Sequence, residues 1–320
     1  MSGGVTVSLD DLDYVESPAP PIAEEKGAVE GSLQTADRPQ TTETETDLPT
    51  TARLSRTRFL RKRVFVLPFV NASDYKDPPY GDMVSQKLVD ALEASGRVVV
   101  LDDHLLRRFV SENGIDGADL HKPFWITRLY EVFGVHAVVS GSLAELNVAT
   151  TGSSVTEDIE VGLAIARIEA RLIDASTGNV IRTYTGRNPL YKSKEIGEFN
   201  RERAILRAID VGLEQISTGL LDSLRFFDWS ARVIRTENGR VYIDAGRQSG
   251  LQTGDVLDVY GPGREIVNPV THIPLGWAPG PLKGRIQVSG FFGIDSAYAT
   301  PLEGNEFSAR DMVKVSQTGP

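Results

Sequence analysis

The sequence contains no cysteine among its 320 residues, which excludes disulfide bonds, thiolate nucleophiles and metal sites built on cysteine. Long apolar runs are also missing. The longest lie around residues 64–70 and 135–143, well short of the ~18 residues that read as a membrane-spanning helix. Residues 1–10 have neither the basic start nor the apolar stretch of a signal peptide, so no export signal is predicted there.

Motifs of catalysis and cofactor binding are missing as well. The four histidines, His104, His121, His136 and His272, share no metal-ligand spacing. The Gly-rich stretch 246–254 lacks the Lys-Ser or Lys-Thr of a phosphate-binding loop, and no Gly-x-Ser-x-Gly motif occurs. We therefore predict a protein that is not an enzyme and that has no catalytic residue, cofactor or metal.

Charge is distributed unevenly along the chain, whose formal net charge is −10. Residues 1–52 carry eleven acidic and two basic residues and are rich in Pro, Thr and Ser, a composition typical of a disordered tail. Residues 53–63 carry six basic residues and no acidic one and are interpreted as a basic linker. An anionic surface could bind this linker, with Arg61 and Arg63 as contacts, but a solvated lead-in to the first strand is the simpler interpretation.

The remaining residues predict two folded domains and no binding to nucleic acid, which would need clustered positive charge on the body of the protein. Residues 64–228 alternate strand and helix signals, which predicts an α/β domain with a mixed sheet. The run 64–70 is typical of a strand buried on both faces, and Pro68 indicates either an edge position or an early strand end. The expected helices lie around residues 83–92, 103–113, 123–133 and 206–224.

Residues 229–316 contain short β-type segments separated by Gly- and Pro-rich turns, which predicts a small all-β barrel. Residues 262–283 form a long Pro-rich loop within it, and long loops in compact domains are commonly functional. The candidate partner contacts in this loop are Arg264, Ile273, Leu275 and Trp277. An exposed aromatic such as Trp277 could anchor a partner; in the alternative, these side chains fold back over an open end of the barrel.

Several motifs in residues 231–315 resemble the carboxy-terminal domain of the flagellar assembly protein T family. They are Val241-Tyr-Ile-Asp-Ala-Gly246, Gly250-Leu-Gln-Thr-Gly-Asp-Val-Leu-Asp-Val-Tyr260, Glu265-Ile-Val-Asn-Pro-Val-Thr-His272, Leu275-Gly276 and Gly284-Arg-Ile-Gln-Val288. Where the family's loop reads Asp-Pro-x-Thr-Gly, this chain has Asn268-Pro-Val-Thr-His272, a departure that can alter the turn.

Residues 64–224 are similar to a broader group, which comprises the middle domain of the same flagellar family, the amino-terminal domain of TolB and the curli-secretion lipoproteins. The matching motifs are Val64-Phe-Val-Leu-Pro-Phe-Val-Asn71, Tyr80-Gly81-Asp82, Val98-Val-Val-Leu-Asp102 and Val138-Val-Ser-Gly-Ser142. The resemblance implies a TolB-like α/β domain followed by an SH3-like barrel.

The resemblance also implies a function. Such domains are scaffolds of the bacterial envelope that act through protein contacts, without catalysis or cofactor. The implied partners are other envelope or flagellar basal-body proteins, with a homo-oligomeric ring as one arrangement, peripheral membrane contact as another, and no transmembrane span. The implied location is the periplasm or the outer membrane, with the cytoplasm as the alternative because no export signal is predicted.

Two other functions remain open beside this flagellar or related scaffold. One is a curli-type secretion component that oligomerises around a pore, which needs membrane-spanning hairpins. The best position for one, residues 148–158, is too short for two strands of ~9–11 residues each. The other is an enzyme or nucleotide binder that uses the strand ends of the α/β domain, and it requires a polar pocket at that place.

Overall fold

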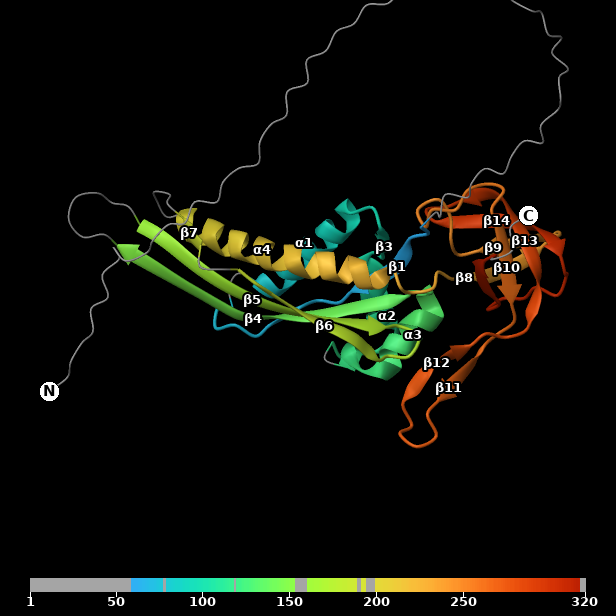
Figure 1. Cartoon of the computed structure of the whole chain (residues 1–320), viewed down its shortest axis with the longest axis horizontal. Coiled ribbons are helices and arrows are strands. Elements are labelled where there is room, and N and C mark those ends of the chain that lie inside the picture. Colours follow the sequence, from blue (N-terminus) through green and yellow to red (C-terminus); the bar gives the residue numbers. More distant parts are fainter. Residues whose placement is uncertain are drawn as a thin grey trace, which may run out of the picture. The chain divides into compact units, whose positions relative to one another are not determined.

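The computed structural model describes residues 59–76, 79–117, 119–152, 160–188, 191–193 and 199–316. The acidic tail 1–52, most of the basic linker 53–63 and much of the 148–158 segment considered for a pore lie outside the described residues. The α/β domain and the barrel fall within one unit of the chain, Arg56–Pro320, and their elements are drawn in Figure 1.

A mixed sheet forms the centre of the α/β domain, as the sequence predicts. The strand order is β3-β1-β4-β5-β6, and β2 pairs with β4 while β7 pairs with β5. The bounds are β1 Lys62–Val66, β2 Val70–Asn71, β3 Val98–Val100, β4 Ala137–Gly152, β5 Glu160–Asp174, β6 Val180–Arg187 and β7 Tyr191–Ser193. β1 runs parallel to β3 and β4, whereas β4, β5 and β6 are antiparallel neighbours.

All five residues of β1 are buried, as its apolar run predicts. The strand ends at Val66, which confirms an early end before Pro68. An edge position is wrong, because β1 pairs with a neighbour on each side. Lys62 and Arg63, predicted to belong to the basic linker, are buried residues of this strand.

Helices cover both faces of the sheet (Figure 1). Their bounds are α1 Tyr80–Ala94, α2 Asp103–Asn113, α3 Pro123–Phe133 and α4 Phe199–Leu224, with a short 3₁₀ helix at Asp119–His121. Val64 packs in the core under α1 and α4, whereas the next residue, Phe65, packs in the core under α2 and α3. The described residues contain no helix long and apolar enough to cross a membrane.

The ends of α2 and α3 follow the predicted signals. The Asp102 side chain accepts a hydrogen bond from the His104 backbone N–H at 2.8 Å and so caps α2. Gly114 and Gly134 close α2 and α3 in the left-handed conformation, which glycine adopts without steric penalty. Local chemistry therefore fixes where these helices begin and end.

Six strands close into a barrel in the order β10-β13-β14-β9-β8-β15, which confirms the predicted barrel. Their bounds are β8 Ala231–Glu237, β9 Arg240–Ile243, β10 Val256–Tyr260, β13 Leu282–Phe292, β14 Ser296–Glu303 and β15 Met312–Val315. Alternate side chains such as Leu257 and Val259 fill its core, as the twofold period of a strand requires.

The Pro-rich segment 262–283, expected to be a loop, contains a β-hairpin instead. Its strands are β11 Arg264–Val267 and β12 Pro274–Ala278, paired antiparallel. The Asn268 side chain shapes the turn by accepting hydrogen bonds from the backbone N–H groups of Val270 at 2.8 Å and Thr271 at 3.1 Å. His272 has φ 56°, so it keeps the left-handed backbone that a glycine would favour at this position.

Candidate functional site

The two candidate residues of the basic linker differ in their surroundings. Arg61 is exposed, and its backbone N–H donates to the Ser249 carbonyl at 2.9 Å. The Arg63 side chain is buried and lies 3.1 Å from the Asp244 carboxylate, and it also donates to the Asp244 carbonyl at 2.8 Å. Arg63 therefore joins β1 to the barrel, which corrects the prediction that it contacts an outside partner.

A second set of contacts continues from Asp244 toward helix α3. Its side chain accepts a hydrogen bond from the Arg232 backbone N–H at 2.7 Å. The Arg232 guanidinium donates to the Glu131 carbonyl at 2.6 Å and lies 4.5 Å from the centroid of the Tyr130 ring. A guanidinium over an aromatic face is a favourable cation–π contact, so these residues fasten the barrel to the α/β domain.

The hairpin is fastened to the same domain along β12. The Trp277 indole N–H donates to the Ser176 carbonyl at 2.9 Å, and the Asn179 side chain donates to the Pro274 carbonyl at 2.5 Å. The Trp277 ring also lies 6.4 Å from that of Tyr130. Ser176 and Asn179 belong to the turn between β5 and β6. Trp277 thus lies against the α/β domain and not over the barrel end, and because it is still 37% exposed, its contact with a partner stays a prediction.

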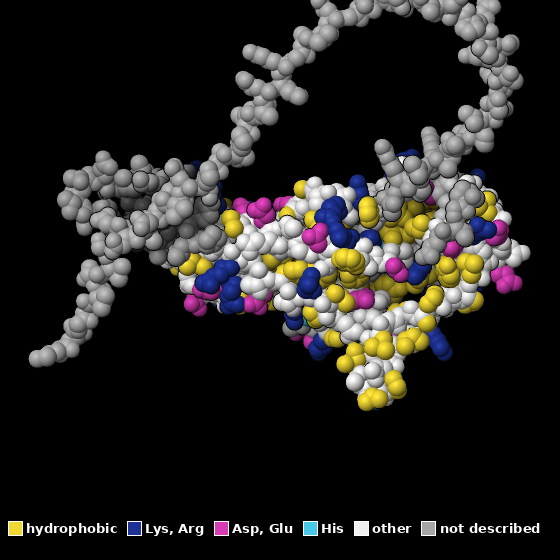
Figure 2. Space-filling view, viewed as in Figure 1, with side chains coloured by type: hydrophobic (Ala, Val, Ile, Leu, Met, Phe, Trp, Pro, Cys, Tyr) yellow, Lys and Arg dark blue, Asp and Glu magenta, His cyan; other side chains and the backbone are white. Residues whose placement is uncertain are grey.

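The remaining candidates lie on the outer part of the hairpin, which we call the hairpin tip and define as residues 267–275. Arg264 is exposed at its base. The exposed apolar residues of the tip are Val267, Val270, Ile273 and Leu275. Val270 is 83% exposed and Leu275 64%, and Figure 2 shows hydrophobic side chains gathered on this hairpin. A fixed, exposed apolar cluster of this kind is typical of an interaction surface.

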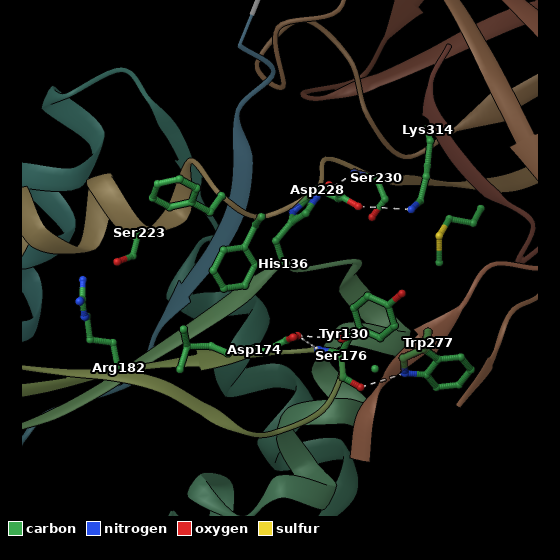
Figure 3. Close-up of a pocket in the computed structure, with 15 residues that line it drawn as sticks. Tyr130, His136, Asp174, Ser176, Arg182, Ser223, Asp228, Ser230, Trp277 and Lys314 are labelled. Atoms are coloured by element: carbon green, nitrogen blue, oxygen red, sulfur yellow. Dashed lines mark hydrogen bonds and ion pairs between the residues drawn. The ribbon is translucent and has the colours of Figure 1, made fainter. Parts of the chain in front are cut away.

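A cavity of about 730 Å³ lies beside the anchored side of the hairpin (Figure 3). Its lining combines aromatic residues such as Tyr130 and Trp277 with charged ones. Several of its polar lining residues already form hydrogen bonds or ion pairs within the protein. The Asp174 carboxylate accepts hydrogen bonds from the Ser176 backbone N–H at 2.8 Å and hydroxyl at 2.7 Å, and Lys314 lies 3.6 Å from Asp228. The Asp174 carboxylate and the Lys314 ammonium are therefore already engaged within the protein.

His136 in this cavity is a structural residue. Its Nδ1 faces the Arg63 backbone N–H and its Nε2 faces that of Ser230, each at 3.0 Å. Burial, followed by the nearby charges of Arg63 and Lys62, lowers the pKa of His136 to about 3. A neutral imidazole has one acceptor nitrogen, so the ring can accept from only one of these two N–H groups. It is therefore poorly suited to act as a general base.

No local sequence pattern marks Tyr130, Ser176, His136 or Asp244 as parts of this junction. One signal for the hairpin was present: residues 266–282 contain no Asp, Glu, Lys or Arg. An uncharged stretch of that length within a domain that is otherwise rich in charge indicates a surface that contacts something apolar. Among the described residues, no group of three His, Asp or Glu side chains could hold a metal ion.

Comparison with protein families finds one match. The model of the family described as curli production assembly/transport component CsgG matches residues 61–214, which is the α/β domain up to the middle of α4. The match supports the curli-type part of the predicted resemblance, and the flagellar part stays a prediction. No curated protein matches the sequence.

Several solved structures have similar segments. Lipoprotein GNA1162 from Neisseria meningitidis is 16% identical with a TM-score of 0.33, over 51% of this chain and 97% of that one. The LpoB C-terminal domain from Salmonella enterica is 14% identical with a TM-score of 0.31, over 40% and 83%. The PelC dodecamer from Paraburkholderia phytofirmans is 18% identical with a TM-score of 0.30, over 50% and 87%. With TM-scores below 0.5, these likenesses carry no functional argument.

Proposed function

We propose that this protein is a non-catalytic assembly component of the bacterial cell envelope, which docks onto another envelope protein through its hairpin tip. The observation that carries the proposal is an exposed, uncharged tip on a hairpin whose other side is fixed by Trp277 and Asn179. A surface held in place before binding loses little conformational entropy when it binds. The match of residues 61–214 to a curli assembly/transport family supports the envelope setting.

The composition of the tip favours a protein partner over a lipid surface. Proteins that anchor at a membrane interface commonly use Trp, Tyr, Lys and Arg there. Residues 267–275 contain none of these four types, and Trp277 is already bonded to Ser176. Valine, isoleucine and leucine side chains on a rigid turn instead form an exposed apolar surface that a folded partner can bury.

The outer strand of the hairpin adds a second means of contact. Among the described residues, β11 pairs with β12 and with no other strand. Its free edge can therefore accept an extended segment of the partner by strand addition. In this proposal backbone hydrogen bonds along β11 supply affinity, while Val270 and Leu275 supply specificity.

The proposal is tested by restoring function in a strain that lacks the gene. We expect Val270→Asp to abolish assembly of the envelope structure while the protein still accumulates in the envelope fraction. Ile294→Asp is the matched control, because Ile294 is 84% exposed on the turn between β13 and β14 of the barrel. Full function with Val270→Asp, or equal loss with both variants, would contradict docking through the tip.

A flagellar basal-body structure is the second candidate for what is assembled. The observation that favours it is His272, whose φ of 56° lies in the region that glycine favours, at the position where the flagellar family's loop has Gly. The SH3-like character of the barrel and a homo-oligomeric ring belong to this finer proposal. Loss of swimming on deletion, with curli-type transport intact, would support it; normal swimming would contradict it.

A further inference from the structure

A second cavity, of about 950 Å³, lies in the α/β domain at the carboxyl end of β1, between α1 and α2. After β1 the chain runs through α1 to β3. In the sheet, β3 is the neighbour of β1 on one side and β4 is its neighbour on the other. In open α/β sheets, ligands bind in the crevice at such a switch in strand order. The volume is also within the range of small-molecule sites.

Half of the residues that line this strand-end cavity are apolar, and the others are Gly117 and polar or charged residues. Its branched aliphatic residues are Val66, Val70, Val89, Leu106, Val110 and Leu120. Side chains of this type offer no directional contact and favour a ligand that gains from leaving water, such as a hydrocarbon chain. These residues therefore suit the apolar part of a ligand, and the uncharged polar residues Ser85, Gln86 and Ser111 of the lining suit an uncharged head group.

Two carboxylates argue against a nucleotide or other phosphate in this cavity. Asp82 lies in the first turn of α1 and Asp103 in the first turn of α2, and both line the cavity. Helix amino termini attract anions, but here each already carries an acidic side chain. Arg107, which also lines the cavity, is ion-paired with Asp103. A phosphate would therefore meet two negative charges, so the pocket required by a nucleotide binder has the wrong polarity.

The His121 ring also lines the cavity. Burial, and to a lesser extent the nearby Arg171, lowers the pKa of His121, so the ring adds no positive charge that would attract a phosphate. Its Nδ1 atom is closed to solvent and has no hydrogen-bond partner among the described residues. A ligand in the open cavity therefore does not reach Nδ1, and the ring contributes an uncharged surface.

We infer that the strand-end cavity binds one aliphatic acyl chain with an uncharged head group. The chain can come from a free amphiphile or from a membrane lipid, since both present the same chemistry. This inference rests on the α/β domain alone and holds whether or not the hairpin tip docks on a protein.

Calorimetric titration of the full chain tests the inference, with 1-monomyristoylglycerol kept below its critical micelle concentration as the probe. We expect one molecule bound per chain and no heat with ATP. Val110→Asp places a charge at the half-buried lining and should lower the affinity at least about tenfold. Val132→Asp is the control, because Val132 is exposed on α3 outside this cavity, and its affinity should be unchanged.

A fold control and a second probe sharpen the outcome. Circular dichroism of Val110→Asp should match that of the parent chain, so that its loss of monomyristoylglycerol binding reports the cavity and not the fold. Co-sedimentation with phosphatidylcholine vesicles that contain dimyristoylglycerol, and not with phosphatidylcholine alone, would identify a neutral membrane lipid as the source if Val110→Asp reduces it. Binding of the monomer alone would identify a free amphiphile. Binding of neither probe, equal effects of Val110→Asp and Val132→Asp, or displacement of the probe by ATP would overturn the inference.

Discussion

The two sides of the β11–β12 hairpin differ in chemistry. The side along β12 uses directional contacts: Trp277 donates to Ser176, and Asn179 donates to Pro274. The tip presents apolar side chains such as Val270 and Leu275 to solvent. The comparison shows that one short hairpin can be fixed by polar contacts on one side and remain available for apolar binding on the other.

Residues that are neighbours in the sequence of the hairpin therefore have separate roles, some in fixing the hairpin to the α/β domain and others in binding a partner. Changes at the junction should lower stability and loosen the hairpin, whereas changes at the tip should affect partner binding and leave stability nearly constant. The first four predictions concern the junction and its turn, from the largest expected effect to the smallest, and the closing one concerns the tip.

The largest effect is expected at the ion pair between Arg63 and Asp244. Their side chains are 7% and 18% exposed, and removal of one partner from a buried pair costs about 3–5 kcal/mol. Because Asp244 is partly exposed, we expect Arg63→Met to lower the free energy of unfolding by about 3 kcal/mol, as measured by urea denaturation. Arg61→Met, at an exposed position, should change it by less than about 0.5 kcal/mol. Equal effects would show that this pair does not fasten the junction.

The next effect depends on pH and involves His136, whose pKa is lowered from 6.5 to about 3 in the folded protein. Between these values the unfolded chain binds a proton that the folded chain does not, so stability falls as pH falls. The expected loss is about 1.4 kcal/mol per pH unit below pH ~6.5. His136→Asn should flatten this part of the profile, whereas His104→Asn, at an exposed residue, should leave it steep. The measurement is urea denaturation at several pH values, and an unchanged slope in His136→Asn is the adverse result.

A smaller effect is expected at the hairpin anchor. Trp277→Phe keeps the aromatic ring but removes the N–H donor to Ser176, and a hydrogen bond of this kind contributes about 1 kcal/mol. Hydrogen exchange of the β11 and β12 backbone should become faster than in the parent protein. Leu275→Ala, at the exposed tip, should leave exchange unchanged. If Leu275→Ala loosens the hairpin as much as Trp277→Phe does, the assignment of the two sides is wrong.

The smallest effect is expected at the turn. His272 has φ 56°, a conformation that costs about 1–2 kcal/mol for residues with a Cβ. Glycine removes this penalty but adds entropy to the unfolded chain, which offsets about 0.5–1 kcal/mol of the gain. His272→Gly should therefore raise the free energy of unfolding by up to about 1 kcal/mol, while Thr271→Gly should not raise it. Thermal denaturation of both variants distinguishes strain relief from a general effect of glycine in the turn.

Features set by neighbouring residues could be predicted from the sequence. Asp102 as a helix cap, the glycines that close α2 and α3, the early end of β1 before Pro68 and the closed barrel all follow from local patterns. The α/β order of elements follows for the same reason. Such signals span a few residues, so they survive without knowledge of the tertiary structure.

The junction could not be predicted, because its partners are distant in the sequence. Trp277 and Ser176 are 101 residues apart, and Arg63 and Asp244 are 181 apart. The basic neighbours of Arg63 in the sequence indicate a solvated linker, because its acidic partner follows only in the barrel. The residue types of the tip leave open whether it is exposed or folded over the barrel, and the fixation of the other side depends on contacts that no local pattern encodes.

Docking through the tip is tested most directly by thiol labelling, because the chain has no cysteine of its own. Val270→Cys and Ile294→Cys place a single thiol at positions that are 83% and 84% exposed. Maleimide should label both at equal rates in the purified protein. In isolated envelopes, where the partner is present, we predict that Val270→Cys is protected while Ile294→Cys reacts as before. Equal reactivity of the two thiols in envelopes would contradict the account.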